Sequence, residues 1–261
     1  MTTIDEIPVS GGTAAAYLDG PDDASGRCLV VPPFGVSAAS LEILASVLVN
    51  DGFATVRLDP RHHVGTGTGT IFDFRLSSFA EDCRRAIDRY RPTCVVAMSM
   101  GARVAMRAMS SSRHVPAAVF LVPVVDVRAT LSAILRHYWF LSTDEDLPAR
   151  MPVLGYEVDT PRFRVDCVRH EMVSLDGTRR DLAACRRPVV LLPGIDDPWA
   201  HLPLVEQLVA SLGQPNVELR PIPCHRHDLH QDPELAMVLM DTVVAEVRRL
   251  HERTGPPGAD R

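Results

Sequence analysis

The chain has 261 residues, of which 46% are hydrophobic, and a formal net charge of -6 at pH 7. This length and apolar content predict a single domain with a substantial core, and the acidic balance argues against a nucleic-acid-binding protein. All 27 basic residues are arginine, which excludes Schiff-base lysine chemistry and a Gly-Lys-Ser/Thr phosphate loop.

The sequence contains neither a predicted membrane span nor a predicted export signal. It has no run of about 18 apolar residues, and its first residues lack the charged and apolar regions of a secretory signal peptide. The six cysteines are dispersed without a Cys-x-x-Cys pair, and most of them lie in apolar runs. A reducing compartment fits these cysteines best, so we expect a cytoplasmic protein with no stable membrane insertion.

Strands and helices are predicted to alternate along most of the chain, from apolar β-branched runs and from apolar residues at helical spacing. In the first half, the predicted elements are edge strands within 1–20, strand 27–33, helix 37–50, strand 53–59, helix 78–90, strand 93–98, helix 100–110 and strand 117–122. In the second half, they are strand 188–193, helix 201–212, strand 217–222 and helix 233–252. This alternation predicts an α/β fold with a mostly parallel, twisted sheet and helices on both faces.

Between residues 123 and 187 the alternation lapses, and we expect an inserted helical cap there. The core is then formed by 1–122 together with 188–252, and the Pro- and Gly-rich residues 253–261 are expected to be a flexible tail. Ser78-Phe-Ala-Glu81 predicts a capping box at its helix start. The run Gly65-x-Gly-x-Gly69 is expected to be a flexible turn, because its spacing differs from that of a nucleotide-binding loop.

The sequence Ala97-Met-Ser99-Met-Gly101 lies between a predicted buried strand and a predicted helix. Small residues two positions before and after a serine are typical of a nucleophile elbow, in which a tight turn lifts the hydroxyl above the sheet. The N–H of Met100, at the helix N-terminus, would then point to where an oxyanion forms. The alternative interpretation is that Ser99 is an ordinary helix N-cap.

A nucleophilic serine needs a base, and in α/β hydrolases the partners follow in the order serine, acid, histidine. Asp196 and Asp197 come directly after the predicted strand 188–193. We favour Asp197 as the acid because it stands three residues after Gly194, a usual spacing in this fold. The alternative for either carboxylate is a turn residue or a helix N-cap.

The base is expected in the histidine-rich segment after the predicted strand 217–222. We favour His227, with His225 and His230 as rivals. A cluster of three histidines could also bind a metal ion, with His62 and His63 as further ligands. Because a serine at a strand-to-helix turn needs no metal, we expect neither a metal ion nor another cofactor.

The loop after the predicted strand 27–33 should supply the second N–H that stabilises an oxyanion, from either Phe34 or Gly35. Serine, acid and histidine follow in the required order, each after a predicted strand. The sequence therefore predicts an α/β-hydrolase fold and a serine hydrolase that uses Ser99, Asp197 and His227.

Several motifs together resemble one family, the acyl-transferase (myristoyl-ACP thioesterase) subunit of the fatty-acid reductase complex of luminous bacteria. The resemblance covers most of residues 28–230, including the predicted cap. It lies in Asp59-Pro-Arg-His62-His63-Val64-Gly65 with Gly69, Ile71 and Phe74, in Ala97-x-Ser99 with Ala102-Arg-Val-Ala105, in Val124-Val-Asp-Val-Arg128-x-Thr130-Leu131, in Phe163-x-x-Asp166-Cys167, and in Asp197, Trp199 and His227-Asp-Leu229.

This resemblance implies a serine acyl-thioesterase or acyltransferase. The acyl donor would be an acyl carrier protein or acyl-CoA, and the acyl group would pass through Ser99 to water, to an acceptor protein or to a small molecule. His63 is assigned to substrate binding, together with four apolar cap residues that could line an acyl tunnel: Leu131, Leu135, Trp139 and Phe140. Those four residues could equally well pack the cap onto the sheet.

Two other functions stay open at this point. The protein could be a carboxylesterase or a hydrolase that releases or cyclises a polyketide chain, since both use the same fold. It could also be a non-catalytic binding protein, although the order of serine, acid and histidine argues against this reading.

Overall fold

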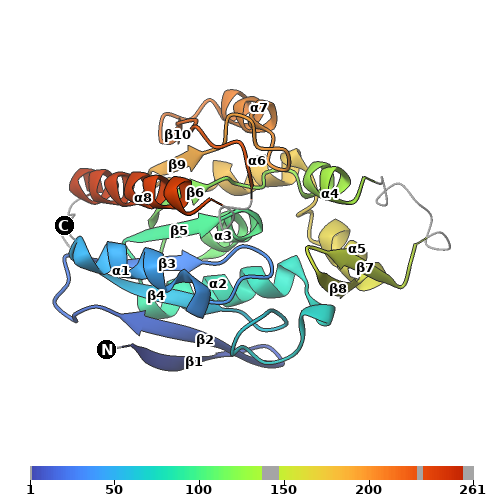
Figure 1. The fold of residues 1–261 in the computed structure, drawn as a ribbon, viewed down its shortest axis with the longest axis horizontal. Helices are drawn as coiled ribbons and strands as arrows, with labels where there is room; N and C mark the ends of the chain where they lie inside the picture. The colour runs from blue at the N-terminus through green and yellow to red at the C-terminus, as the bar shows by residue number, and fades with distance from the viewer. Residues whose placement is uncertain (1, 137–146, 228–231, 255–261) are drawn as a thin grey trace.

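An eight-stranded sheet forms the centre of the computed structural model, which describes residues 2–136, 147–227 and 232–254 (Figure 1). The strand order is β1-β2-β4-β3-β5-β6-β9-β10. The two pairs that β2 forms, with β1 and with β4, are antiparallel, and the other pairs of this sheet are parallel. The strands are β1 (Thr3–Val9), β2 (Gly12–Asp19), β3 (Gly26–Val31), β4 (Phe53–Asp59), β5 (Cys94–Met98), β6 (Ala117–Leu121), β9 (Val189–Leu192) and β10 (Val217–Leu219).

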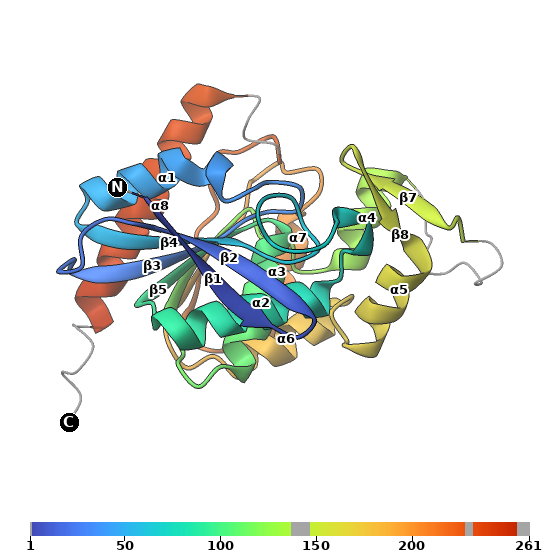
Figure 2. The same cartoon turned by 90° about the horizontal axis from the view of Figure 1, so that it is seen from below.

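Helices cover both faces of this sheet (Figures 1 and 2). One face is covered by α1 (Glu42–Asn50) and α8 (Pro233–Thr254). The other is covered by α2 (Leu76–Tyr90), α3 (Met100–Ser111), α6 (Leu175–Ala183) and α7 (Leu202–Leu212). The prediction of an α/β-hydrolase fold is confirmed by this arrangement. Among the helices of the described ranges, none has the length and apolarity needed to cross a bilayer.

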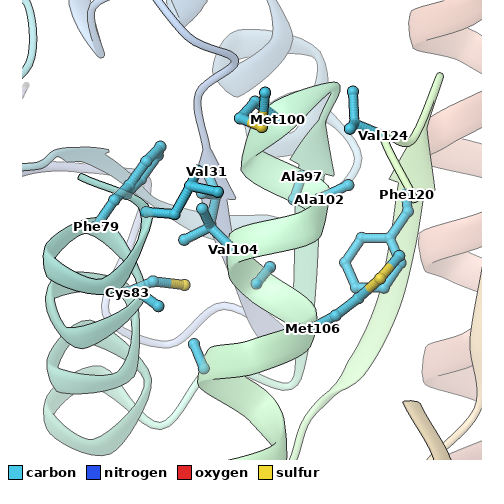
Figure 3. Close-up of a cluster of buried hydrophobic side chains, with 14 of the residues drawn as sticks. Val31, Phe79, Cys83, Ala97, Met100, Ala102, Val104, Met106, Phe120 and Val124 are labelled. Atoms are coloured by element: carbon cyan, nitrogen blue, oxygen red, sulfur yellow. The ribbon is translucent and has the colours of Figure 1, made fainter. Parts of the chain in front are cut away.

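The two faces carry separate hydrophobic clusters because successive strand residues point to opposite sides. In β3, Leu29 and Val31 join the cluster beneath α2 and α3, whereas Cys28 and Val30 join the cluster beneath α1 and α8. Figure 3 shows the first cluster, where Phe79 of α2 and Val104 of α3 lie close to Val31. This packing holds the start of α3 firmly against the sheet.

The segment predicted as a helical cap contains a β-hairpin as well as helices. Its elements are α4 (Val127–Leu135), β7 (Arg150–Val153), β8 (Tyr156–Asp159), α5 (Thr160–Arg169) and α6. The hairpin and α5 stand beyond the end of the sheet (Figure 1), while α6 packs against α3 and α7. Helix α8 continues to Thr254, two residues into the predicted tail, and residues 255–261 lie outside the described ranges.

The predicted capping box at Ser78 and Glu81 is wrong. Helix α2 begins at Leu76, and the Ser78 hydroxyl donates to the carbonyl of Arg75 instead of capping a free N–H. The N–H of Ser77 donates to a carboxylate oxygen of Asp166 at 3.0 Å. A carboxylate of the distant helix α5 therefore accepts a free N–H at the start of α2. No local motif could have indicated this contact.

Candidate active site

Ser99 occupies the sharp turn between β5 and α3. Its φ of 52° and ψ of -123° are strained for a residue with a side chain. The backbone is held there because the Ser99 N–H donates to the carbonyl of Leu121 at 3.1 Å and its carbonyl accepts the N–H of Val124 at 3.1 Å. A Cβ on Gly101 would lie 2.2 Å from the carbonyl oxygen of Pro32, so this position requires glycine. Both features are those of a nucleophile elbow.

A line of hydrogen bonds joins Ser99 to the two residues expected to assist it. The Ser99 Oγ lies 2.6 Å from Nε2 of His227, and Nδ1 of His227 lies 2.7 Å from Oδ2 of Asp197. The side chains of His227 and Asp197 are 6% and 0% exposed. With the ring proton on Nδ1 facing Asp197, Nε2 is free to accept the hydroxyl proton of Ser99.

The carboxylate of Asp197 is fixed from both oxygens. Its Oδ1 accepts the N–H groups of Trp199 at 2.8 Å and Ala200 at 3.0 Å, while Oδ2 faces His227. Burial alone would raise the pKa of Asp197, but the His227 hydrogen bond and charge and the two N–H groups together hold it below its ordinary value. Asp197 is therefore an anion that can orient and stabilise a protonated imidazole.

The rival residues are placed elsewhere. Asp196 and His225 pair with each other at 2.8 Å on the surface, where their side chains are 65% and 70% exposed. His230 lies outside the described residues. Within the described ranges, no group of three or more His, Cys, Asp or Glu side chains is arranged to hold a metal ion.

The loop after β3 corrects the oxyanion prediction. The N–H of Gly35 donates to Nε2 of His63 at 3.0 Å, so it is not available to an oxyanion. The carbonyl of the same residue accepts the hydroxyl of Tyr156, in β8, at 3.2 Å. The N–H groups of Phe34 and Met100 remain as candidates, because Met100 begins α3 and its amide has no carbonyl partner within the helix.

The assignment of His63 to substrate binding is also corrected. Its side chain is buried, at 4% exposure, and it is not part of the lining of either cavity at Ser99. Burial lowers the pKa of His63 to about 4, so the imidazole is neutral at physiological pH and can accept the Gly35 N–H. His63 therefore positions the loop after β3.

The glycine-rich run forms a mostly exposed loop that hydrogen bonds anchor at Thr66 and Thr68, and its flexibility stays a prediction. It wraps around the buried carboxylate of Asp59, which accepts the N–H of Thr66 at 2.9 Å and that of Ala38 at 2.5 Å. Gly65, with φ of 106°, lies so close that a Cβ would be 2.2 Å from this carboxylate. Asp59 thereby ties the loop to the segment after β3.

Two apolar cavities meet at Ser99 and His227. One, of about 30 Å³, lies beneath the cap and includes Leu131 in its lining. The other is a groove of about 730 Å³ between α1 and α8. Leu135 is half-buried against the core and lines neither cavity, and Trp139 and Phe140 lie outside the described residues.

Sequence reasoning missed the groove and the role of Tyr156. The methionines of the groove, at positions 98, 237 and 240, come from a strand end and from the terminal helix, and no local motif marks them. The aromatic ring of Tyr156 packs edge-on against Phe34, with ring centroids 6.1 Å apart. A long-range contact of this kind has no signal in a single sequence.

Comparisons with known proteins identify the family to which the chain is similar. The family model for acyl transferases matches residues 28–242. An acyl transferase of Shewanella hanedai is 28% identical over 194 residues, which are 72% of this chain and 63% of that protein. The chain thus spans about 63% of the length of the curated relatives that it matches first.

Solved structures cover more of this chain than the acyl transferase of Shewanella hanedai does. Est1E from Butyrivibrio proteoclasticus, solved with ferulic acid bound, has a TM-score of 0.74 at 19% identity, over 94% of this chain and 98% of that one. A thioesterase domain from the curacin biosynthetic pathway has a TM-score of 0.64 at 13% identity, over 94% and 99%. At these identities the likeness concerns the fold.

Proposed function

This chain belongs to the acyl transferase family, and from that premise we propose that it is a serine acyl-thioesterase or acyltransferase whose nucleophile is Ser99. The acyl donor is a fatty-acyl thioester of an acyl carrier protein or of coenzyme A. The observation that carries the proposal is the continuous line of hydrogen bonds from Ser99 through His227 to Asp197. This is the arrangement that activates a serine for acyl transfer.

The proposed acylation step uses this line of hydrogen bonds. Ser99 Oγ attacks the thioester carbonyl carbon while Nε2 of His227, 2.6 Å away, takes the hydroxyl proton. The N–H groups of Phe34 and Met100 stabilise the oxyanion of the tetrahedral intermediate. When this intermediate collapses, the carbon–sulfur bond breaks, and the imidazolium returns the proton to the departing thiolate.

Deacylation repeats these events with a second nucleophile. Water or another acceptor gives its proton to His227 and attacks the carbonyl carbon of the acyl-serine. The bond to Ser99 Oγ then breaks, and the proton passes back to that oxygen. Asp197 stays ionised through both steps, because hydrogen bonds to the anion keep its pKa below the ordinary value.

The proposal is tested with Ser99→Ala and, as a control, Ser111→Ala at the exposed end of the same helix. Hydrolysis of a panel of acyl-CoA and acyl-carrier thioesters should fall by about 10³–10⁶-fold in Ser99→Ala and stay unchanged in the control. Intact-mass analysis should detect an acyl adduct on the wild-type chain that Ser99→Ala lacks. Thioester cleavage that survives in Ser99→Ala would refute the assignment.

The esterase alternative is separated by substrate. Apolar surfaces on both sides of Ser99 accept an oxygen ester as readily as a thioester. If the enzyme prefers p-nitrophenyl esters to acyl-CoA of the same chain length, its substrate is an oxygen ester and not a thioester. A chain that reacts with no fluorophosphonate probe would instead be a binding protein.

A further inference from the structure

The nucleophile stands at the junction of two cavities that differ greatly in size. Both share Phe34, Ser99, Leu154, Trp199 and His227 in their lining. The cavity beneath the cap holds only about 30 Å³, well below the size usual for ligand sites. The groove between α1 and α8 holds about 730 Å³, within the range of roughly 300–1,000 Å³ usual for ligand sites.

The cavity beneath the cap is filled by its own side chains. Leu131, Val158 and Phe163 are 2%, 2% and 3% exposed, and Met151 and Val153 are buried with them. These side chains belong to the main hydrophobic cluster of the molecule. A long alkyl chain could enter only by forcing this packed core apart, which costs free energy that an open groove does not require.

The groove has the opposite character. Its walls come from the segment after β3, the start of α1, the ends of β5 and β6, the cap hairpin at Leu154 and Tyr156, and the first three turns of α8. Ile43 and Met237, on opposite walls, are 59% and 46% exposed, although both are large and apolar. Exposed apolar side chains that converge in a hollow mark a site for an apolar ligand.

The side chains that line the groove suit the alkyl chain of an acyl group better than the polar pantetheine arm of its carrier. Away from Ser99 and His227, the polar side-chain groups of the groove are the Ser40 hydroxyl, the indole N–H of Trp199 and the Tyr156 hydroxyl, which already donates to Gly35. A pantetheine arm carries two amides whose hydrogen bonds this surface would leave unmade. Met98, Met237 and Met240 instead offer flexible thioethers that adapt to chains of different shape.

We infer that the acyl chain of the substrate lies in the groove between α1 and α8, with its carbonyl at Ser99, and that this groove sets the acyl-chain length. The inference rests on the proposed function for its substrate class. This groove takes the place of the acyl tunnel beneath the cap that the sequence analysis had considered. The pantetheine arm then approaches Ser99 from outside the groove.

A matched pair of variants on one helix tests this placement. Met237 and Val238 are adjacent, both are large and exposed, and only Met237 lines the groove. In a Ser99→Ala background, Met237→Asp should weaken binding of tetradecanoate at least tenfold, whereas Val238→Asp should leave it unchanged. The binding is measured by calorimetry, which needs no turnover.

A steric pair compares the groove with the cap. Ala236 lines the groove and Ile134 lines the cavity beneath the cap, and both are half-buried. Ala236→Trp should lower the ratio of tetradecanoyl-CoA to butyryl-CoA turnover at least tenfold, with butyryl-CoA retained as evidence of folding. Ile134→Trp should leave that ratio unchanged.

The outcomes separate the inference from the proposed function. If Ile134→Trp lowers the ratio and Ala236→Trp does not, or if Met237→Asp and Val238→Asp bind tetradecanoate equally, the groove assignment is overturned. If tetradecanoate binding depends on Met237 but the wild-type chain cleaves no thioester, the groove assignment stands and the proposed reaction fails.

Discussion

Two adjacent carboxylates follow β9, and their surroundings separate their roles. Asp197 is buried against His227, while Asp196 pairs with His225 in solvent. We predict that Asp197→Asn lowers kcat for thioester hydrolysis by about 10²–10⁴-fold, because an amide can neither hold the required imidazole tautomer nor stabilise its cation. Steady-state kinetics with one acyl-CoA substrate would measure the loss.

Asp196→Asn is the matched control for this prediction. Its ion pair is exposed, and such pairs contribute little to stability or orientation. The variant should keep kcat within about twofold of wild type. If Asp196→Asn and Asp197→Asn lose kcat equally, the pairing of Asp197 with His227 does not determine the activity.

His63 is connected to the proposed oxyanion site through the N–H of Gly35, in the loop that also carries Phe34. His63→Leu would leave that part-buried donor without its partner, at a cost of about 1 kcal/mol, and would release the loop that carries Phe34. We predict that kcat falls about tenfold or more while KM changes little, because an oxyanion contact is made only in the transition state.

His63→Gln separates positioning from simple loss of packing. The glutamine side-chain oxygen can accept the Gly35 N–H, so this variant should recover most of the activity. Kinetics of both variants on one substrate make the comparison. If His63→Gln is as impaired as His63→Leu, the hydrogen bond to Gly35 is not what the loop needs.

At the level of elements, α3 can approach β3 only because Gly101 has no side chain. An added Cβ would meet the carbonyl oxygen of Pro32 at 2.2 Å and that of Val31 at 3.1 Å, both of them backbone atoms. Gly101→Ala should therefore destabilise the fold by about 1–3 kcal/mol, as overpacking usually does. Urea unfolding measures this, with the exposed Ser111→Ala in the same helix as control.

The hairpin of the cap contacts the loop after β3 through Tyr156. Tyr156 of β8 donates to the carbonyl of Gly35, and its ring packs against Phe34. Tyr156→Phe removes the hydrogen bond and keeps the ring, so we predict a loss of about 0.5–1.5 kcal/mol in the free energy of unfolding. A variant with unchanged stability in urea would mean that the cap and the loop are not coupled through this bond.

For the whole molecule, the buried imidazole of His63 links folding to pH. Its pKa is about 4 in the folded state and 6.5 in its ordinary environment. Between these values the unfolded chain binds a proton that the native chain does not, so stability increases with pH in this window. Acidification from pH 6.5 to 4 should therefore cost up to about 3 kcal/mol through this one residue.

The difference between wild type and His63→Gln isolates that contribution from all other titrating groups. The free energy of unfolding is measured in urea between pH 4.5 and 7.5 for both proteins. The value for wild type minus the value for His63→Gln should decrease as the pH falls. A difference that stays constant over this range would mean that His63 titrates alike in both states.

Much of the molecule could be predicted because its signals are local. The apolar strand pattern, the helical spacing and the small residues around Ser99 each lie within a few neighbouring positions, and they predicted the fold class and the order of Ser99, Asp197 and His227. The family resemblance is likewise confirmed by the match over residues 28–242. The predicted start of α2 was wrong because Asp166, which accepts the N–H of Ser77, lies 89 positions away in the sequence.

The sequence by itself determined where strands and helices alternate and which candidate site residues follow each strand. The reason is that the periodicity of strands and helices can be recognised from neighbouring residues. Only the tertiary structure decided that Asp197 and not Asp196 faces His227, that Gly35 gives its N–H to His63, and that a groove opens between α1 and α8. The physical reason is distance along the chain: Gly35 and His63 are 28 positions apart, and Ser99 and His227 are 128 apart. Such contacts depend on how whole helices and strands pack.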